Sequence, residues 1–354
     1  MLKSLLASTA LLITLSLPTI AFAAEATPSY DSYKSWFVAC DNGLACQARG
    51  FADDGSAEIP DLNVTRDAGP TAKTLVTLKL PFAAEATDLK VDGSPLILAP
   101  DAWEIQRDDG FTTLTLTGDE AIETLIAQLR DASALQTNNP EASVPLDGFV
   151  AALLRMDDRQ GRIGSVTALI RKGKAPASAV PAAPDLPEAP EYKPGAPLKA
   201  GEDAALLARA RKDLAAVFTS EDCDDTMPSD IDSSEALALD DTHGVVFIAC
   251  IMGAYQGSSL VAVVPRSGND PARLVRPRLP ITDNDTDTAL LSEPSFDPET
   301  GTLSMTARGR GLGDCGLSAE WVWDVAQFQL TGGSYQMSCG GSQPGDWPTV
   351  YRSR

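Results

Sequence analysis

Six cysteines in three sequence-local pairs constrain the fold of this 354-residue chain more than any other feature. None of the pairs has the two-residue gap that is typical of zinc sites, so we interpret all six cysteines as disulfide partners. Six cysteines can combine in many ways, and we expect each one to pair with its nearest neighbour. The predicted bridges are Cys40–Cys46, Cys223–Cys250 and Cys315–Cys339.

The geometric argument for this pairing is clearest at Cys40 and Cys46. Asn42-Gly43 lies between them, and this dipeptide is a strong signal for a tight turn. A hairpin would place the two cysteines across from each other, within the Cα separation that a disulfide needs. Each of the other two pairs lies inside one predicted domain, where closing the loop would stabilise the fold by about 3 kcal/mol.

The first 23 residues have the three parts of a secretory signal peptide. Lys3 is the only charged residue before Glu25, an apolar stretch runs from Leu5 to Ala21, and Ala21-Phe22-Ala23 fits a cleavage site. The stretch contains hydroxyl residues and a proline and falls short of the roughly 20 residues of a membrane span, which makes an uncleaved anchor the weaker alternative. We therefore predict Sec-type export to the periplasm, where disulfides persist, and no membrane span after cleavage.

The predicted mature chain is strongly acidic. Removing residues 1–23 removes one lysine and no acid, which leaves 27 basic and 49 acidic residues and a formal charge of −22. Such a surface repels nucleic acid and anionic lipid and favours a basic partner, although solubility alone is the simpler explanation of the charge. The partner therefore stays open between another envelope protein and a basic ligand, and no cofactor is predicted.

A proline-rich segment divides the mature chain. Residues 174–199 hold seven of the 25 prolines, a density that blocks helix and sheet and favours an extended polyproline II conformation. A mature chain of 331 residues is too long for a single small core. We therefore predict two domains, 25–173 and 200–354, joined by this linker, with a proline-rich ligand for a partner as the alternative role of the segment.

The pattern of residues 25–173 predicts an α+β domain, because strand signals are followed by two helix signals. The expected strands are a hairpin over 35–49, a strand at 74–80, a second hairpin that turns at Asp109-Gly110, and a closing strand at 166–170. Apolar residues recur at helical spacing in 119–132, where Asp119 is placed to cap the start, and in 147–158.

Residues 200–354 predict a mainly antiparallel β domain. A helix pattern at 202–218 comes first. Apolar runs bounded by turn residues follow at 245–250, 259–264 and 302–307, and each predicts a short strand. Trp321 and Trp323 lie on the next strand, and Phe328 and Leu330 lie on the one after it. We expect a curved antiparallel sheet or a small barrel.

The sequence offers little catalytic chemistry. His243, the only histidine, lies in a predicted turn, and the cysteines are predicted to be oxidised, so neither a histidine-dependent triad nor a thiolate is indicated. With 49 acidic residues, two carboxylates could still meet in a cleft as hydrolases require. We therefore predict a non-enzymatic binding or envelope-associated protein, with a carboxylate-dependent hydrolase or a cation-binding protein as alternatives.

Two motifs resemble known binding loops and depart from them. Asp283, Asp285 and Asp287 begin like a calcium loop, but Thr288 and Pro294 stand where an EF-hand needs glycine and glutamate. The three aspartates could therefore form a looser calcium site or simply an acidic surface loop. Residues 311–316 match the letters of a dinucleotide glycine motif, but a strand pattern follows where a helix is needed, so we interpret them as a turn whose glycines take positive φ beside a disulfide.

The candidate binding surface of the second domain combines two arginines, an acid and two tryptophans. Arginine and tryptophan are the residue types that most often dominate binding surfaces. The alternative is that the tryptophans belong to the core and that Arg310 pairs with Asp314. The residues lie within sixteen positions and are Arg308, Arg310, Asp314, Trp321 and Trp323.

Several segments of the chain resemble the proteobacterial family catalogued as domain of unknown function 1176. They are residues 37–43, 153–162, 308–316 and 321–324, of which the glycine-arginine-cysteine segment 308–316 is the most specific. The first half also has a weaker likeness to the exported invasion-associated locus B family in its Trp-x-x-x-Cys-Asp opening. The resemblance implies an exported bacterial protein and supplies no activity. Val325 stands where the family usually has a turn glycine.

Overall fold

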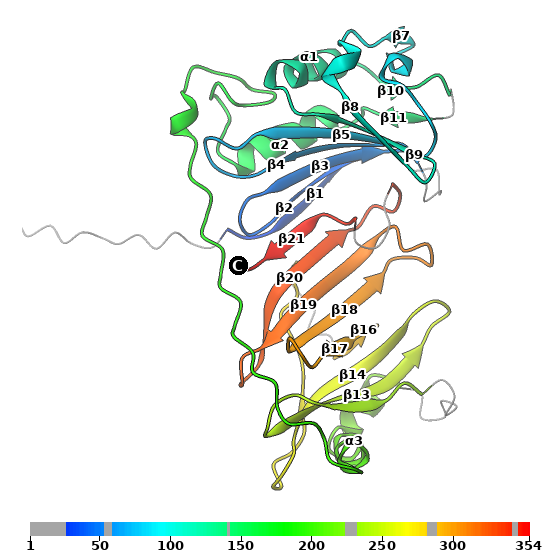
Figure 1. Ribbon diagram of the computed structural model, residues 1–354, viewed down its shortest axis with the longest axis vertical. Helices are drawn as coiled ribbons and strands as arrows, with labels where there is room; N and C mark the ends of the chain where they lie inside the picture. Colours follow the sequence, from blue (N-terminus) through cyan, green and yellow to red (C-terminus); the bar gives the residue numbers. More distant parts are fainter. Residues whose placement is uncertain (1–25, 53–58, 140–141, 224–231, 282–288, 342–345) are drawn as a thin grey trace, which may run out of the picture.

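The computed structural model of the chain is elongated, with an N-terminal half stacked on a C-terminal half (Figure 1). It describes residues 26–52, 59–139, 142–223, 232–281, 289–341 and 346–354. We call residues 26–173 the N-terminal half and residues 200–354 the C-terminal half. The first combines helices with antiparallel sheets and the second is mainly antiparallel β, as the sequence predicts. Whether each half folds alone stays a prediction.

A seven-stranded antiparallel sheet organises the N-terminal half, in the order β1-β2-β3-β4-β5-β9-β8. Its strands are β1 (Ser29–Tyr33), β2 (Trp36–Cys40), β3 (Cys46–Phe51), β4 (Asp61–Arg66), β5 (Thr74–Leu80), β8 (Glu104–Asp108) and β9 (Phe111–Leu116). A smaller sheet consists of β11 (Ser143–Pro145), β10 (Ala134–Gln136), β6 (Lys90–Val91) and β7 (Ser94–Pro95). The two helices are α1 (Asp119–Leu129), which contacts β5, and α2 (Phe149–Arg159), which packs on β1, β2 and β3.

These elements confirm both predicted hairpins, the strand at 74–80 and the two helices. At the second hairpin, Asp109 and Gly110 both have positive φ, 45° and 87°, because a two-residue turn must match the twist of its strands. The first hairpin has a longer turn, in which Leu44 and not Gly43 has positive φ, 59°. Asp41 organises this turn, because its Oδ1 accepts the N–H groups of Gly43 and Ala45, each at 2.8 Å.

Two local expectations in the N-terminal half are wrong. Asp119 does not cap α1: Gly118 precedes the helix, and Asp119 is its first residue, where the carboxylate pairs with Lys73 at 2.6 Å. Residues 166–170 form turns and not a strand. The cause is the buried carboxylate of Asp157, whose Oδ2 accepts the N–H groups of Leu169 and Ile170 that a strand would have to give to a neighbour.

Two facing antiparallel sheets form the C-terminal half. The first consists of β12 (Glu235–Ala238), β13 (His243–Met252), β14 (Gly257–Pro265), β15 (Arg273–Leu274) and β16 (Leu290–Ser292). The second consists of β17 (Ser295–Asp297), β18 (Thr302–Arg308), β19 (Gly316–Trp323), β20 (Phe328–Gln336) and β21 (Thr349–Arg352). Their inner faces share one apolar core, in which Phe247 and Val261 of the first sheet meet Leu303 and Trp321 of the second. The described residues therefore form a two-sheet sandwich and not the single curved sheet or barrel that we expected.

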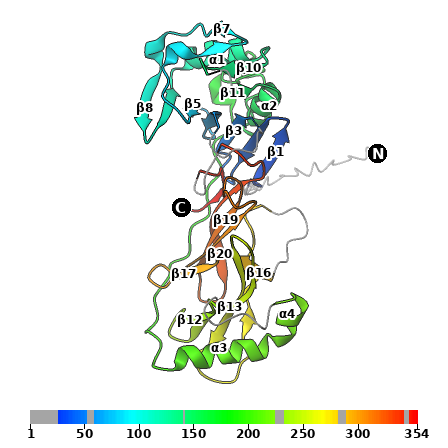
Figure 2. The same ribbon diagram turned by 90° about the vertical axis from the view of Figure 1, so that its right-hand side faces the viewer.

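The helical segment before these sheets covers the outer face of the first one. It consists of α3 (Glu202–Asp213) and α4 (Ala215–Ser220), which Leu214 separates, where a single helix was expected (Figure 2). Leu206 and Ala210 of α3 pack against Val246 and Ile248 of β13 in a core of their own. No helix in the described part of the chain is long and apolar enough to cross a membrane.

The predicted disulfide pairing is confirmed at all three bridges. Cys40–Cys46 joins the paired ends of β2 and β3, with 4.1 Å between the Cα atoms. Cys223–Cys250 ties the segment after α4 to β13, and Cys315–Cys339 ties the chain just before β19 to the segment after β20. Each bridge therefore lies within one half, as expected.

The turn after β2 holds the last strand of the opposite half. Asn42 is fully buried, and its amide donates to the Arg352 carbonyl and accepts from the Arg352 N–H, each at 3.0 Å. This side chain therefore pairs with β21 as a neighbouring strand would. Asp41 completes the contact, because its Oδ2 lies 2.5 Å from Arg352 Nε. Burial raises the pKa of the Asp41 carboxyl, and the adjacent Arg352 guanidinium opposes that rise.

A buried arginine forms the second contact between the halves. Arg49 is paired with Asp61 at 2.9 Å, and it donates to Gln336 Oε1 and to the backbone carbonyls of Gly341 and Asp346 in the C-terminal half. Beside it, Tyr30 stacks on Phe37 and meets the edge of Tyr335. Burial raises the pKa of Tyr30 to about 12. The two halves therefore meet through buried polar and aromatic groups and not only through apolar surface.

Apart from a short 3-10 helix, η3 (Ala177–Ala179), the proline-rich segment is extended, as predicted, and it lies along both halves (Figure 1). We call residues 174–199 the strap. Tyr192 anchors it to the C-terminal half: its hydroxyl donates to the Leu239 carbonyl at 2.6 Å, and its ring packs on Gly301, where a Cβ would lie 2.3 Å from a ring carbon. The strap also exchanges two backbone hydrogen bonds with Arg354 at the end of the chain. It is thus a packed element as well as a connection.

Replacing Asn42 with alanine tests how much its hydrogen bonds to β21 stabilise the protein. We expect the free energy of unfolding to fall by about 2 kcal/mol or more, because each buried group left without a partner costs about 1–3 kcal/mol. Asn138, whose exposed amide donates to Asp88, is the matched control, and Asn138→Ala should change stability little. Urea unfolding followed by tryptophan fluorescence measures both. Equal losses in the two variants would contradict the structural role of Asn42.

Candidate anion-binding pocket

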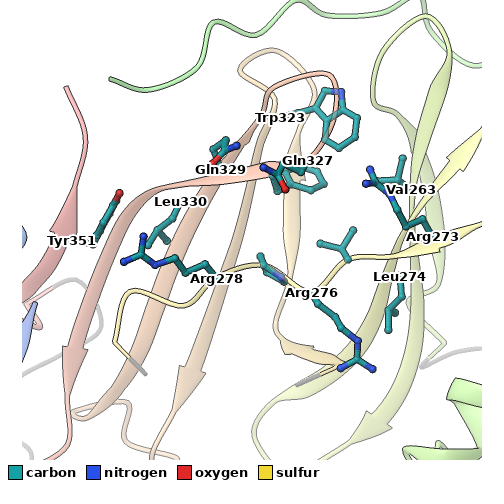
Figure 3. Close-up of a pocket in the computed structure, with 13 residues that line it drawn as sticks. Val263, Arg273, Leu274, Arg276, Arg278, Trp323, Gln327, Gln329, Leu330 and Tyr351 are labelled. Atoms are coloured by element: carbon teal, nitrogen blue, oxygen red, sulfur yellow. The ribbon is translucent and has the colours of Figure 1, made fainter. Parts of the chain in front are cut away.

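A cavity of about 490 Å³ in the C-terminal half gathers arginine side chains, and we call it the arginine pocket (Figure 3). One wall is formed by β14, β15 and the segment that follows β15, and the other by the ends of β19, β20 and β21. Its polar and aromatic lining consists of Arg273, Arg276, Arg278, Trp323, Gln327, Phe328, Gln329 and Tyr351. None of the described lining residues is acidic, in a chain of formal charge −21.

The local sequence explains why arginines line this wall. In residues 275–279, Val275 and Leu279 are buried in the core between the sheets, whereas Arg276 and Arg278 are exposed. Extended backbone sends alternate side chains to opposite faces, so apolar residues turn inward and the arginines turn outward. Pro277 has no N–H to give to a strand pair, which fits the position of this segment at the edge of the sheet.

Aromatic rings position two of these arginines. The Arg273 guanidinium lies over the Trp323 ring, 5.9 Å from its centroid, and donates to the Ala326 carbonyl. The Arg278 guanidinium lies 5.8 Å from the centroid of Tyr351. A ring face attracts a cation without neutralising its charge. The described contacts of Arg273 and Arg278 therefore orient their guanidinium groups and leave the pocket positively charged.

Trp323 is itself held from behind by Asp240. The indole N–H donates to Asp240 Oδ2 at 2.9 Å, and Asp240 Oδ1 also accepts from the backbone and hydroxyl of Thr242 and from the backbone of His243. Burial on its own would raise the pKa of Asp240, but these hydrogen bonds outweigh it and lower the pKa to about 2. Asp240 is therefore ionised at neutral pH and fixes one wall of the pocket.

His243 lies on this same rear side of Trp323. Its Nδ1 is 3.1 Å from Asp240 Oδ2, and its ring meets the edge of Trp323 at 5.9 Å between centroids. The histidine does not belong to the lining of the arginine pocket. It is the first residue of β13 and does not lie in a turn, where the sequence had predicted it, and it supports the tryptophan wall.

The sequence-predicted binding surface is split into two places. Trp321 and Trp323 are buried in the core, and the Trp321 indole N–H donates to the Arg278 carbonyl at 2.7 Å, which holds the arginine-bearing segment in place. Arg310 pairs with the buried Asp314 beyond the other end of β19, and Arg308 donates to the Tyr255 carbonyl there. The binding role of Arg308 and Arg310 stays a prediction.

The arginines of the pocket itself were not predicted from the sequence. The signal was present in residues 273–278, where three arginines alternate with apolar residues and proline in a chain that is otherwise acidic. No pattern in the sequence shows that the ends of three strands, at residues from 323 to 351, lie opposite this segment. The pocket is a product of long-range packing.

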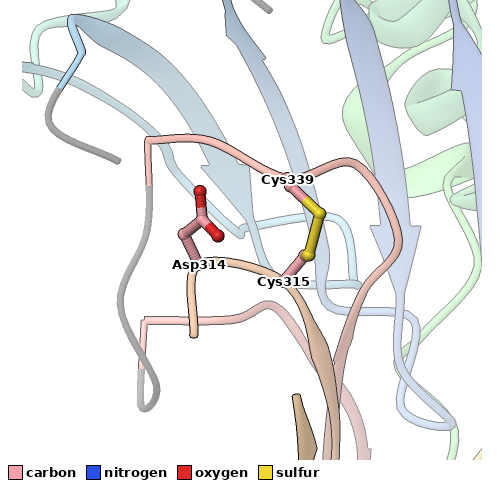
Figure 4. Close-up of side chains that lie close together, drawn as sticks. All are labelled: Asp314, Cys315 and Cys339. Atoms are coloured by element: carbon pink, nitrogen blue, oxygen red, sulfur yellow. A yellow bond between two sulfur atoms is a disulfide. The ribbon is translucent and has the colours of Figure 1, made fainter. Parts of the chain in front are cut away.

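The glycine-rich turn before β19 has a structural role beside its disulfide. The carboxylate of Asp314 and the sulfur atoms of Cys315 and Cys339 lie within 4.8 Å of one another (Figure 4). The two sulfurs are bonded to each other and Asp314 is paired with Arg310, so these groups are already engaged. Gly316 has positive φ, 149°, and a Cβ on it would lie 2.2 Å from the Ala307 carbonyl oxygen.

Two alternatives from the sequence concern acidic residues. Asp283, Asp285 and Asp287 lie outside the described residues. Among the described carboxyls, burial raises the pKa of Asp41 and Asp61, but each of these is paired with an arginine at the contact between the halves, and neither lines the arginine pocket. Asp41 lines a different cavity together with Asp67, and the carboxylate-dependent hydrolase stays an alternative from the sequence.

Comparison with known proteins places the chain among uncharacterised relatives. The family model described as "Protein of unknown function (DUF1176)" matches residues 30–354. The "Uncharacterized protein YpfG" of Escherichia coli (strain K12) is 31% identical over 341 residues, which covers 93% of this chain and 94% of that protein. No solved structure matches the chain.

Replacing Asp240 with asparagine tests how the tryptophan wall is held. The folded pKa of about 2 lies below the unfolded value of about 3.9, so Asp240 contributes stability above pH 4 that is lost as the pH falls toward 2. We expect Asp240→Asn to lose about 1–3 kcal/mol at pH 7 and to flatten the acid limb of the stability curve. The control is Asp131→Asn, at a 91% exposed side chain. An unchanged acid limb in Asp240→Asn would refute the assignment.

Proposed function

The chain belongs to the DUF1176 family of proteins of unknown function, and from its own geometry we propose that it is a non-enzymatic binding protein whose arginine pocket holds a small anionic ligand. One observation carries the proposal. Arg273 and Arg278 line a cavity to which the described part of the chain contributes no acidic residue, and aromatic rings orient both. The cavity volume, about 490 Å³, is in the range of small-molecule sites.

The lining favours a ligand that bears a carboxylate or a phosphate together with neutral polar groups. A guanidinium presents its N–H donors as a planar fork that matches two oxygens of such an anion. Gln327 adds an amide at the same wall, which can donate to or accept from hydroxyl groups. The Gln329 Nε2 already donates to Asp324 Oδ2 at 2.7 Å, so Gln329 offers its amide oxygen as an acceptor. Phe328 and Tyr351 supply flat apolar surface next to the charges.

This proposal refines the electrostatic expectation from the sequence. The overall negative charge favours a basic partner at the outer surface, whereas the local charge of the pocket favours an anion. The two statements concern different surfaces and different partners, one macromolecular and one small. Another envelope protein therefore stays a candidate partner for the acidic exterior.

Substitution of the two ring-stacked arginines tests the pocket. We expect inorganic phosphate or citrate to bind the native protein in isothermal titration calorimetry, and Arg273→Gln and Arg278→Gln each to weaken the Kd at least about tenfold. Arg130→Gln, which removes an exposed arginine of the N-terminal half, should leave the Kd unchanged. The proposal is wrong if neither anion binds, or if the double variant Arg273→Gln/Arg278→Gln binds as tightly as the native protein while remaining folded.

We also propose that the protein works in the periplasm after removal of residues 1–23. The signal-like start of the chain and three disulfides support this location, because disulfides persist in oxidising compartments. Intact-mass analysis of the protein from a periplasmic fraction should give a chain that begins at Ala24 and lacks six hydrogens relative to the reduced form. A chain that retains Met1, recovered with free thiols from the cytoplasm, would contradict the proposal.

A further inference from the structure

A second cavity, in the N-terminal half, has a buried arginine in its lining. It has a volume of about 380 Å³ and lies between α1, the loop from β4 to β5 and residues 162–177. Arg162 is 1% exposed, and Ile122, Ile126 and Leu169 form apolar surface in the same cavity. We call it the Arg162 cavity. Its lining lies in the N-terminal half and, at Ala177, in the strap, and it shares no residue with the lining of the arginine pocket.

The other cations of this cavity have carboxylate partners. Arg66 is paired with the buried Asp157 at 2.7 Å, and the second oxygen of Asp157 is occupied by backbone N–H groups. At the rim, Lys73 pairs with Asp119 at 2.6 Å. Lys172 pairs in the same way with Glu123, one helical turn further along α1.

Arg162 differs from them, because its described partners are neutral. Its Nη1 donates to the Thr167 hydroxyl at 2.9 Å and its Nη2 to the Gly69 carbonyl. Its Nε is buried and has no hydrogen-bond partner among the described residues. Asp157 attracts this charge more weakly than Arg66 repels it. The cavity therefore carries one positive charge in excess.

Burying a charge without a counter-ion costs free energy, and the pKa of Arg162 reflects this cost. Burial, followed by the repulsion from Arg66, lowers the pKa of Arg162 to about 10. The side chain is still protonated at neutral pH, so the folded protein keeps a desolvated cation that an anion would compensate. A guanidinium has five N–H donors, and beside the buried Nε–H the two described bonds leave one N–H each on Nη1 and Nη2 without a described partner.

We propose that the Arg162 cavity binds a small monocarboxylate with a short apolar chain. The excess of one positive charge matches a single carboxylate on Arg162, and the apolar chain would lie along Ile122 and Ile126 of α1. Asp119 and Glu123 at the rim disfavour a second negative charge at the outer end of the ligand. The site is therefore selective for one carboxylate at its inner end and apolar groups beyond it.

A series of straight-chain acids tests the site. Acetate, butyrate and hexanoate are titrated into the full mature chain at pH 7 by calorimetry, with hexanamide as the uncharged counterpart of hexanoate. We expect hexanoate to bind at least about tenfold more tightly than acetate, because each additional buried methylene tightens binding by about fourfold, and hexanamide to bind at least about tenfold more weakly than hexanoate. The proposal is overturned if no acid binds, or if hexanamide binds as well as hexanoate.

Two sets of variants separate this site from the arginine pocket. Arg162→Met should lose hexanoate binding at least about tenfold, Arg162→Lys should retain part of it, and Arg273→Gln/Arg278→Gln should leave it unchanged. Hexanoate binding that survives in Arg162→Met, or that disappears only in the double variant, would overturn the assignment. If Arg162→Met does not fold, the backbone amide NMR shifts of Gly69 and Thr167 on addition of hexanoate to the native protein decide the question, and unmoved signals count against the site.

Discussion

Hydrogen bonds and an ion pair between one buried turn and the last strand of the chain join the two halves of this protein. The same strand contributes a residue to the arginine pocket. Asn42 pairs with the backbone of Arg352 in both directions, and Asp41 holds its guanidinium. The preceding residue, Tyr351, lies in the core between the sheets and beneath the Arg278 guanidinium. A turn closed by the Cys40–Cys46 bridge thus reaches, through a single strand, the wall of the proposed anion site in the opposite half.

Buried polar groups form the main contacts between the two halves, and most of them have hydrogen-bond partners far away in the sequence. Arg49 and Asp61 are both almost fully buried, and Arg49 reaches three further acceptors in the other half. An apolar contact of the same size would allow the halves to slide, whereas these hydrogen bonds require one register. Among the described residues, Arg162 departs from this pattern, because its hydrogen-bond partners are neutral and its Nε is buried without one, and it lies at the second proposed site.

The sequence predicted what depends on neighbours in the chain and missed what depends on distant contacts. Period-two alternation at 74–80, the Asp109-Gly110 turn and the nearest-neighbour disulfides are local features, and all are confirmed. The strand expected at 166–170 is absent because Asp157, from a helix, captures its N–H groups. The candidate surface was only partly located, since Trp323 was recognised but turns inward, and its arginine neighbour Arg273 comes from another strand.

The central claim is that Arg273 and Arg278 together bind an anion, and side-chain NMR of the arginine Nε–H groups tests it most directly. With the signals assigned through the glutamine variants, titration with citrate should shift the Arg273 and Arg278 resonances along one binding curve with a common Kd. The Arg130 resonance, from an exposed side chain in the N-terminal half, should stay in place. Unchanged Arg273 and Arg278 signals, or an equal shift at Arg130, would show that the pocket is not a specific anion site.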